Sequence, residues 1–309
     1  MSFDLIITSG VSYIKSRDCG YCHGSKNPME SGYSLDSYRK EYLGQRLDKF
    51  KDYPNNTTIG FTVYTCSPQC YERLMDRGFR RSGTFIYRPD LLRNCCRLYT
   101  IRTSLDLIKH PSKGQRHTIN RFEKFIKCEN VRHVKNGKHV AGKPFDIKEH
   151  IINLEKEVDP SRFRTEICST EVTQEKFSLY KKYQIRVHND KPEKVSISGF
   201  KRFLCQTPFA RAFVNHSAAY WEDLNVDWRE GVFENSRPDE ILGPIHECYY
   251  LDNKLIAIGV LDVLPQSLSS VYFIWDPDYA HLGLGNLSAL HELVLTKMLG
   301  KKYYYMGYY

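Results

Sequence analysis

The chain has 309 residues, of which 41% are hydrophobic and 26% are charged. This composition excludes wholesale disorder, and the length allows one large domain or two ordinary ones. The formal net charge of +9 favours polyanionic partners without the extreme basicity of a histone-like protein. No stretch approaches the roughly 20 apolar residues of a membrane span, and the first residues do not resemble a signal peptide. We expect no membrane partner and a location in the cytosol or nucleus, where the ten cysteines stay reduced.

Clustered cysteines in the N-terminal third suggest a metal site. Cys19 and Cys22 form a CxxC pair that can bind one ion, but a tetrahedral site needs four ligands. Two further pairs are available, Cys66 with Cys70 and Cys95 with Cys96. Spacing alone slightly favours the first of these, because adjacent cysteines chelate one ion only with unusual backbone geometry.

Between residues 73 and 102, arginines alternate with aromatic residues. Guanidinium groups and aromatic rings suit contact with phosphates and stacking on bases. A solvated basic face over core aromatics explains the same composition, so both interpretations stay open. The candidate nucleic-acid contacts are Arg77, Arg88, Arg93, Arg97 and Arg102.

Within this stretch, Ser67 and Pro68 predict the start of a short helix that ends before Gly78. The following residues alternate like a strand, with a turn at residues 82–83. Arg80 and Arg81 stand next to this turn, so we expect them to be exposed and able to bind an anion.

The middle of the chain becomes rich in Lys, Arg and His, with a predicted basic helix over residues 115–127. We place the domain boundary here. The expected division is a Cys- and Arg-rich N-terminal domain (1–130), a basic linker or insertion (131–160) and a second domain (161–309). Thr173 is expected to cap the first helix after the strand-like start of that second domain.

The second domain ends in a recognisable succession of elements. Residues 246–279 predict three antiparallel strands in a meander, separated by turn residues at 252–253 and 265–267. A glycine-containing loop, a helical pattern over 286–299 and a last strand over 302–309 follow. Together these elements predict a compact α+β core of the kind that transferases use.

Seven sequence blocks resemble the signature blocks of eukaryotic arginyl-tRNA-protein transferases. They are spread over residues 19–309 and read CGYC, DRGFRRSGTFIYRPD, RNCCRLYTIR, FKRFLCQTPF, GPIHECYYLDNKLIAIGVLDVLP, SSVYFIWDPDY and YYYMGYY. The resemblance implies transfer of arginine from charged tRNA to the α-amine of proteins that begin with Asp, Glu or oxidised Cys. The product is a degradation signal of the N-degron pathway, which a ubiquitin ligase reads downstream.

The same resemblance implies a metal centre and a fold. The family's iron-sulfur or zinc ligands match Cys19, Cys22, Cys95 and Cys96, which replaces the preference from spacing. Its transferase part is similar to N-acetyltransferases (GNAT-like), with a small Cys-rich domain before it. In those acetyltransferases a basic or amide residue opens the glycine loop, whereas Ala280 stands here. We therefore expect no coenzyme A and a donor delivered as Arg-tRNA.

Aminoacyl transfer requires attack of a neutral amine on an ester carbonyl, with a proton acceptor and stabilisation of the oxyanion. His246 and Glu247 are the candidates for proton transfer, with Ser270 as a further catalytic candidate. Deprotonation by water is a competing explanation, because α-amines titrate near ~8 unaided. Ser269, Ser270 and Tyr272 are candidate hydrogen-bond donors to the carbonyl, although they equally suit ordinary positions in a strand.

The two substrates carry charges that need partners. A carboxylate should bind the guanidinium of the donor arginine, and the candidates are Asp262, Asp276 and Asp278. A cation should bind the acidic N-terminal residue of the acceptor, for which Arg80 or Arg81 would serve if the two domains face each other. For Asp276, which precedes a proline, a turn is also a sufficient explanation.

Related proteins continue well past the last block, so the chain resembles a C-terminally truncated member or an unusually short form. A sheet without its last strands would leave residues 303–309 as a bare apolar edge. Two other functions stay open. One is an acetyl-coenzyme A acetyltransferase, which Ala280 disfavours, and the other is a non-enzymatic metal-thiolate redox sensor that binds RNA.

Overall fold

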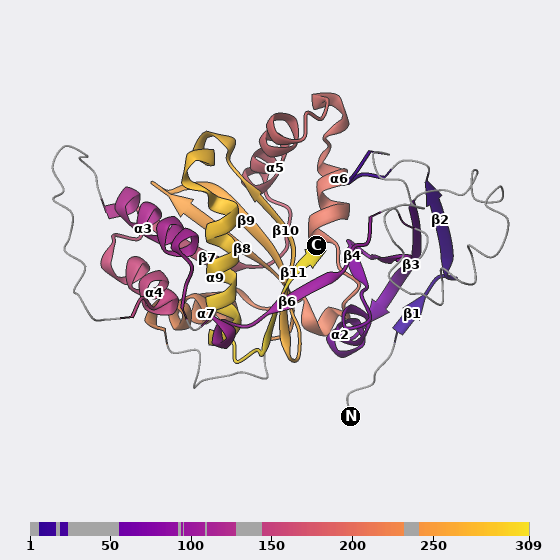
Figure 1. Cartoon of the computed structure of the whole chain (residues 1–309), viewed down its shortest axis with the longest axis horizontal. Helices are drawn as coiled ribbons and strands as arrows, with labels where there is room; N and C mark the ends of the chain where they lie inside the picture. The colour runs from indigo at the N-terminus through magenta and orange to yellow at the C-terminus, as the bar shows by residue number, and fades with distance from the viewer. Residues whose placement is uncertain are drawn as a thin grey trace.

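The computed structural model describes residues 6–16, 19–23, 56–91, 94, 96–108, 110–127, 144–231 and 241–308. Within these residues it contains two β-sheets and several helices, which confirms an α+β fold (Figure 1). Two predicted site residues, Arg93 and Cys95, lie outside the described residues. Among the helices that are described, none is both long and apolar enough to cross a membrane.

The smaller sheet is built from the N-terminal part of the chain. Its strands are β1 (Ile6–Thr8), β2 (Ser12–Ser16), β3 (Asn56–Cys66), β4 (Arg80–Ser82) and β5 (Phe85–Pro89). The central strand β3 pairs antiparallel with β1, β2 and β5. β4 and β5 form a hairpin whose turn contains Gly83 at φ +59°. Helix α2 (Pro68–Met75) begins as predicted, with Ser67 accepting a hydrogen bond from the Cys70 N–H.

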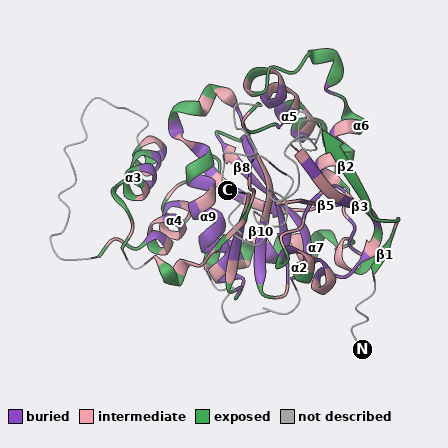
Figure 2. Cartoon of the chain, turned by 45° about the vertical axis from the view of Figure 1, so that its right-hand side comes forward, coloured by how far each residue is buried: buried purple, intermediate pink, exposed green. Residues whose placement is uncertain are grey.

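The larger sheet contains the predicted meander. In spatial order its described strands are β6 (Thr100–Thr103), β11 (Tyr303–Tyr308), β10 (Ser267–Trp275), β9 (Lys254–Val263), β8 (Gly243–Leu251) and β7 (Phe163–Cys168). β8, β9 and β10 pair antiparallel in succession, whereas β10 and β11 are parallel. Apolar residues on both faces of β8 and β9 are buried (Figure 2), because helices cover both sides of this sheet.

One face of the larger sheet packs against α9 (Leu284–Met298), α3 (Lys113–Lys127), α4 (Ile147–Glu157) and α7 (Ala218–Glu230). Helices α5 (Gln174–Val187) and α6 (Ile197–Phe200) pack on the other face, and a π-helical turn, η4 (Lys201–Cys205), continues α6. Thr173 caps α5 as predicted. The short 3-10 turns are η2 (Leu105–Leu107), η3 (Pro192–Lys194), η5 (Arg211–Phe213) and η6 (Pro277–Leu282). The basic helix predicted at 115–127 begins two residues earlier, at Lys113.

The outer edge of β11 is covered by a strand from the first part of the chain. β6 pairs antiparallel with β11, from Tyr304 opposite Thr103 to Tyr308 opposite Thr100. The expectation of a bare apolar edge at residues 303–309 is therefore wrong, and Tyr304 and Tyr305 are buried. The error arose because β6 pairs with a strand about 200 residues later, which local sequence patterns cannot reveal.

The two sheets also share a core. Phe61, Val63, Tyr71 and Ile86 of the smaller unit pack in one cluster with Leu264 and Tyr305 of the larger sheet. Both β6 and α3 precede residue 130, yet they lie with the larger sheet, whereas the predicted first domain extended to that residue. Figure 1 shows the result: the small sheet lies beside the larger one, with β4 next to β11.

Candidate active site

The parallel strands β10 and β11 separate after a short contact. They pair only over residues 267–269 and 303–305, although β10 continues to Trp275 and β11 to Tyr308. At the same place the pairing of β10 with β9 shifts register between Ser270 and Tyr272. A bulge beside two separating strands frees backbone groups for a ligand. We call this opening the β10–β11 gap.

Arg80 lies in the β10–β11 gap. Its Nη2 donates to the Ser270 carbonyl oxygen at 2.8 Å, and its Nη1 donates to Ser269 Oγ at 3.2 Å. On the other strand, a Cβ added to Gly307 would lie 3.9 Å from Nη2. The structure therefore brings the predicted site residue Arg80 to two others, Ser269 and Ser270, which follow it by 189 and 190 positions in the sequence.

Arg81 forms a bidentate ion pair with Asp262 of β9. Its Nε and Nη2 lie 2.6 Å from Oδ2 and Oδ1. The prediction that Arg80 and Arg81 are exposed is wrong: they are 5% and 4% exposed, because the hairpin packs against the larger sheet with both side chains inside. Asp262 already has a guanidinium partner within the protein, so a donor arginine would have to displace Arg81 to bind there.

The two predicted proton-transfer residues point to opposite faces of the sheet, as neighbours in a strand do. His246 is fully buried on the side of α5 and α6, where its Nε2 lies 3.0 Å from the carbonyl oxygen of Leu204. Burial, followed by the nearby charge of Lys176, lowers the pKa of His246 to about 3, so this ring is neutral at pH 7. His246 and Glu247 therefore cannot act as one dyad.

Glu247 belongs to a buried network on the face that α9 covers. His291 of α9 lies between two carboxylates, with Nδ1 2.9 Å from Glu247 Oε1 and Nε2 3.1 Å from Glu155 Oε1. The other oxygen of Glu247 accepts a hydrogen bond from Tyr249 at 2.7 Å. Burial opposes protonation of His291, but Glu247 and Glu155 outweigh it and raise the pKa to about 10. The protonated ring ties α9 and α4 to β8.

Glu292 extends this network to the β10–β11 gap. It is 1% exposed, its Oε2 accepts from the Tyr304 hydroxyl at 2.7 Å, and its Oε1 has no partner among the described residues. Burial and then the charge of Glu247 raise the pKa of Glu292 to about 8, against the opposing effect of the Tyr304 and Ser270 hydroxyls. Glu292 is thus a buried carboxyl that can change protonation near neutral pH, beside the residue where β10 leaves β11.

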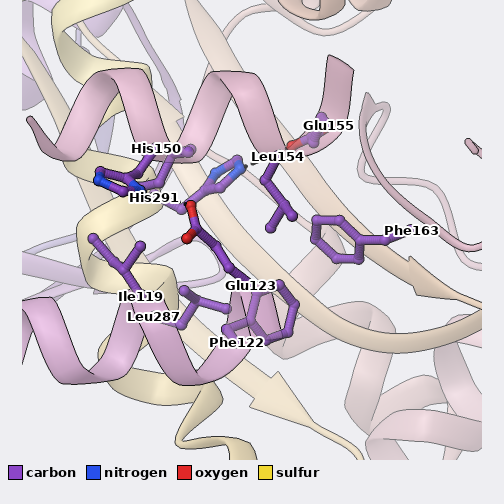
Figure 3. A pocket seen from close by; sticks show the side chains of 10 residues that line it. Ile119, Phe122, Glu123, His150, Leu154, Glu155, Phe163, Leu287 and His291 are labelled. Carbon is purple, nitrogen blue, oxygen red and sulfur yellow. Dashed lines mark hydrogen bonds and ion pairs between the residues drawn. The ribbon is translucent and has the colours of Figure 1, made fainter. Parts of the chain in front are cut away.

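Figure 3 shows the outer end of the network, where α3, α4, α9 and β7 enclose a narrow pocket. A second pair, His150 Nδ1 and Glu123 Oε1, lies 2.8 Å apart there. Most other lining residues are apolar, including Ile119, Phe122, Leu154, Phe163 and Leu287. The free volume is about 10 Å³, enough for about one water molecule. The pocket is too small for an organic ligand.

Three members of this network, Glu155, His291 and Glu292, are absent from the residues predicted from sequence. A signal was available: His291 and Glu292 interrupt a helix that is otherwise apolar on nearly every side. Buried charges are costly unless they are paired, so two adjacent ionisable residues in such a helix predict partners in the sheet below.

A crevice of about 530 Å³ lies between the smaller sheet and α5–α6. Hydroxyl, aromatic and basic residues line it, among them Ser82, Phe85, Tyr180, Lys194, Arg202 and Phe203. The ring of Phe203 lies 5.0 Å from that of Tyr272, which is on β10 beyond the gap. The Tyr272 hydroxyl lies 3.1 Å from His188 Nε2. This crevice adjoins the separated part of β10 and has the volume of an ordinary ligand site.

The two aspartates after β10 are already paired with cations. Asp276 is buried, contacts Lys182 and Lys254, and accepts from the Asp278 N–H, which makes it the N-cap of η6. Burial raises the pKa of Asp276, but these partners outweigh it and hold the pKa below its usual value. Asp278 is exposed and contacts Lys182 and Arg186. Of the three predicted guanidinium-binding carboxylates, Asp278 is the accessible one.

The four described arginines of the predicted RNA contact do not form one exposed surface. Arg77 and Arg102 are exposed, whereas Arg88 and Arg97 are half-buried. Arg88 stacks over the Phe79 ring at 5.0 Å, and Arg102 stacks over a tyrosine ring at 4.1 Å while it pairs with Asp76. These contacts support the alternative explanation, in which several of these arginines pack against core aromatics.

The described cysteines of the predicted metal site lie together. The Sγ atoms of Cys19, Cys22 and Cys96 are all within 4.8 Å of one another. Four thiolates around one zinc ion lie about 3.8 Å apart, given Zn–S bonds of about 2.3 Å, so this set fits a thiolate-bound metal. Cys66 instead lies in the core of the smaller unit.

Comparison with known proteins gives two family matches. The family described as "Arginine-tRNA-protein transferase, N terminus" matches residues 17–117, and "Arginine-tRNA-protein transferase, C terminus" matches residues 175–309. Together they cover most of the chain.

Individual relatives agree. Arginyl-tRNA--protein transferase 1 of Saccharomyces cerevisiae is 42% identical over 295 residues, which is 94% of this chain and 55% of the yeast protein. Arginyl-tRNA--protein transferase 2 of Arabidopsis thaliana is 42% identical over 140 residues, 44% of this chain and 21% of the plant protein. The aspartate/glutamate leucyltransferase of Shewanella putrefaciens is 28% identical over 245 residues, 79% of this chain and 73% of the bacterial protein. The chain thus spans about half the length of the yeast relative.

Proposed function

Because this chain belongs to the arginine-tRNA-protein transferase family, we propose that it transfers arginine from Arg-tRNA to the α-amine of proteins that begin with Asp, Glu or oxidised Cys. The arginylated product would be a degradation signal for a ubiquitin ligase. The bacterial relative is named an aspartate/glutamate leucyltransferase, and the acidic residues in that name agree with the acidic acceptors proposed here. The cytosol or nucleus, where thiols stay reduced, suits this reaction.

The observation that carries the proposal is the β10–β11 gap, with α9 as the connection between its two strands. The separation and the bulge leave backbone groups free to hold an acyl group, and the meander before them agrees with the proposed GNAT-like fold. The loop before α9 has Ala280 where an acetyltransferase has a basic or amide residue. This difference supports an aminoacyl ester on RNA over acetyl-coenzyme A as the donor.

The proposed reaction forms a bond between the acceptor nitrogen and the arginyl carbonyl carbon. The ester bond to the tRNA ribose breaks, the ribose oxygen leaves with a proton, and the amine loses one. We assign Ser270 to the reacting centre, since it stands where β10 leaves β11, and Glu292 to proton acceptance behind it. Glu247 and His291 are positioning residues in this scheme, because their ion pair fixes α9 against β8.

Charge complementarity supports two further roles. Arg80 is a buried cation in the β10–β11 gap, suited to the acidic side chain of the acceptor. Asp278 is the accessible carboxylate for the donor guanidinium, and Tyr272 and Ser269 of β10 are further candidate substrate contacts. Lys182 and Arg186 lower the pKa of Asp278 to about 2, so this carboxylate stays ionised at any physiological pH.

The N-terminal cysteines support a metal centre in the same protein. Cys19, Cys22, Cys95 and Cys96 would hold zinc or an iron-sulfur cluster, and thiolate ligation suits both. Zinc would supply structural stability, whereas a cluster would add sensitivity to oxidation. The residues of the β10–β11 gap perform the transfer in either case.

The decisive experiment incubates the chain with charged arginyl-tRNA and a peptide that begins with Asp, beside an otherwise identical peptide that begins with Gly. We expect arginine on the Asp peptide alone. Absence of label on the Asp peptide would reject the proposal. Parallel incubation with acetyl-coenzyme A tests the acetyltransferase alternative, for which we expect no product.

A further inference from the structure

Helix α3 (Lys113–Lys127) presents a continuous row of basic residues to solvent. Its inward face is apolar, with Ile119, Phe122 and Ile126 buried. The opposite face is exposed, and its basic residues follow one another at helical spacing. We call them the α3 stripe: Lys113, Arg116, His117, Arg121, Lys124 and Lys127. Figure 2 shows α3 at the edge of the molecule, with its outward residues exposed.

Most of this charge is not neutralised by the residues that the structure describes. Lys127 pairs with Glu157 at 2.7 Å. Lys113, Arg116 and Lys124 have no acidic partner among the residues that the structure describes. Like charges three or four positions apart on a helix repel each other, so the stripe weakens α3 slightly. A row of exposed cations without described acidic partners suits an external polyanion.

The stripe also contacts the turn that precedes α9. Arg121 Nη2 donates to the carbonyl oxygen of Leu282 at 2.9 Å, and a Cβ added to Gly283 would lie 2.5 Å from this nitrogen. That turn carries the chain from β10 into α9, the two elements next to the β10–β11 gap. From Lys113 to Lys127 the helix is about 21 Å long at 1.5 Å per residue. The stripe therefore runs past the turn that enters α9, over the length of several nucleotides.

We propose that the α3 stripe binds the sugar-phosphate backbone of the donor tRNA while the aminoacylated end lies in the β10–β11 gap. This inference rests on the proposed function, which requires an acylated RNA. A base-paired stem presents regularly spaced phosphates that a rigid row of cations can follow without reading sequence. The arginines of residues 73–102 are less suited to this role, because Arg88 and Arg102 are occupied by aromatic and acidic neighbours.

The experiment replaces the three unpaired cations together, as Lys113→Ala/Arg116→Ala/Lys124→Ala, in the full chain. A matched control removes two lysines and one arginine from exposed positions outside α3, as Lys191→Ala/Arg229→Ala/Lys302→Ala. Binding of arginyl-tRNA is measured over a series of salt concentrations. Each lost phosphate contact should reduce the slope of log K against log salt by about 0.7–0.9, so we expect a total reduction of about 2–3 for the stripe variant. The control, with the same change in net charge, should keep the wild-type slope.

A charge-preserving variant, Lys113→Arg/Arg116→Lys/Lys124→Arg, should retain the wild-type slope, which separates lost charge from lost fold. In transfer assays the stripe variant should raise the KM for arginyl-tRNA at least 10-fold and leave kcat unchanged. An unchanged salt slope in the stripe variant, or an equal loss in the matched control, would overturn the inference. If the wild-type chain binds arginyl-tRNA through the stripe yet transfers no arginine, the proposed function is rejected and the binding surface is retained. If the wild-type chain transfers arginine and the stripe variant binds arginyl-tRNA equally well, the binding surface is rejected and the proposed function is retained.

Discussion

Arg81 and Asp262 join the two sheets through two hydrogen bonds of 2.6 Å inside the protein, where neither side chain reaches water. Each charge depends on the other, since a single buried ion without its partner is strongly unfavourable. The pair fixes the β4–β5 hairpin against β9 and thereby places Arg80 in the β10–β11 gap.

Removing one member of this pair should therefore destabilise the whole fold. We expect Asp262→Ala to lower the free energy of unfolding by about 3–5 kcal/mol, because it leaves Arg81 charged and buried. Urea denaturation measures the loss. The double variant Arg81→Met/Asp262→Leu removes both charges and should recover most of it; a double variant as unstable as the sum of two single ones would contradict this account.

His291 should make stability depend on pH. Its pKa is about 10 in the folded chain, against roughly 6.5 when unfolded. The stabilisation from Glu247 and Glu155 is therefore complete below pH ~6.5 and is lost as pH rises through about 10. We expect His291→Gln to lower the free energy of unfolding at pH 6 by about 3–5 kcal/mol. The stability of this variant should change little with pH between about 6.5 and 10.

Because Glu292 titrates in a neighbouring range, this comparison is best made in the Glu292→Gln background. Urea denaturation at pH 6 and pH 9.5 gives the free energy of unfolding of this background with His291 and with Gln at that position. Equal pH dependence with and without His291 would show that the ring is not protonated in the folded chain.

Glu292→Gln should impair chemistry more than binding. Loss of a positioned proton acceptor typically costs about 10²–10⁴-fold in rate, so we expect kcat for arginine transfer to fall by about 100-fold or more. Affinity for arginyl-tRNA, measured separately, should stay at the wild-type value. Glu171→Gln, a change at an exposed carboxylate away from the network, serves as the control. Normal turnover in Glu292→Gln would reject the assignment and favour deprotonation of the amine by water.

Gly83 marks a close approach of the hairpin to η4. A Cβ there would lie 2.1 Å from the backbone oxygen of Arg202, and φ is +59°. We expect Gly83→Ala to lower the free energy of unfolding by about 1–3 kcal/mol or more. The added Cβ would strain the backbone at this φ, and it would clash with a backbone oxygen that cannot rotate away. Gly285→Ala, where nothing lies within 4 Å, should be neutral or stabilise α9 slightly. Thermal unfolding compares the two; equal midpoints would contradict the described contact.

The cysteine cluster predicts metal content. Cys19→Ser should lower the bound zinc or iron measured by elemental analysis, because it removes one of the thiolate ligands. Cys70→Ser, half-buried on α2 and outside the cluster, should leave metal content unchanged. Equal metal content in both variants would place the metal elsewhere.

Local chemistry made much of the fold predictable. Ser67 and Thr173 cap their helices as expected, and the meander follows from alternating strand and turn residues. Errors arose wherever distant segments meet. The burial of Arg80 and Arg81 depends on carboxylate and carbonyl groups some 180 positions later, which no window of sequence around the hairpin contains.

The site was harder to predict than the fold for a related reason. His246 and Glu247 were obvious by residue type, but a strand sends adjacent side chains to opposite faces, and each then meets different helices. Only packing showed that Glu247 meets His291 and that His246 meets the Leu204 carbonyl.

The pairing of β6 with β11 has a consequence for synthesis. Thr103 leaves the ribosome about 200 residues before its partner Tyr304, which corresponds to roughly 10–40 s at 5–20 residues per second. Throughout that time the edge of β6 has no native neighbour, and the larger sheet cannot close. The larger sheet therefore completes only after β11 has been synthesised, and nascent chains stalled before Tyr303 should remain sensitive to protease.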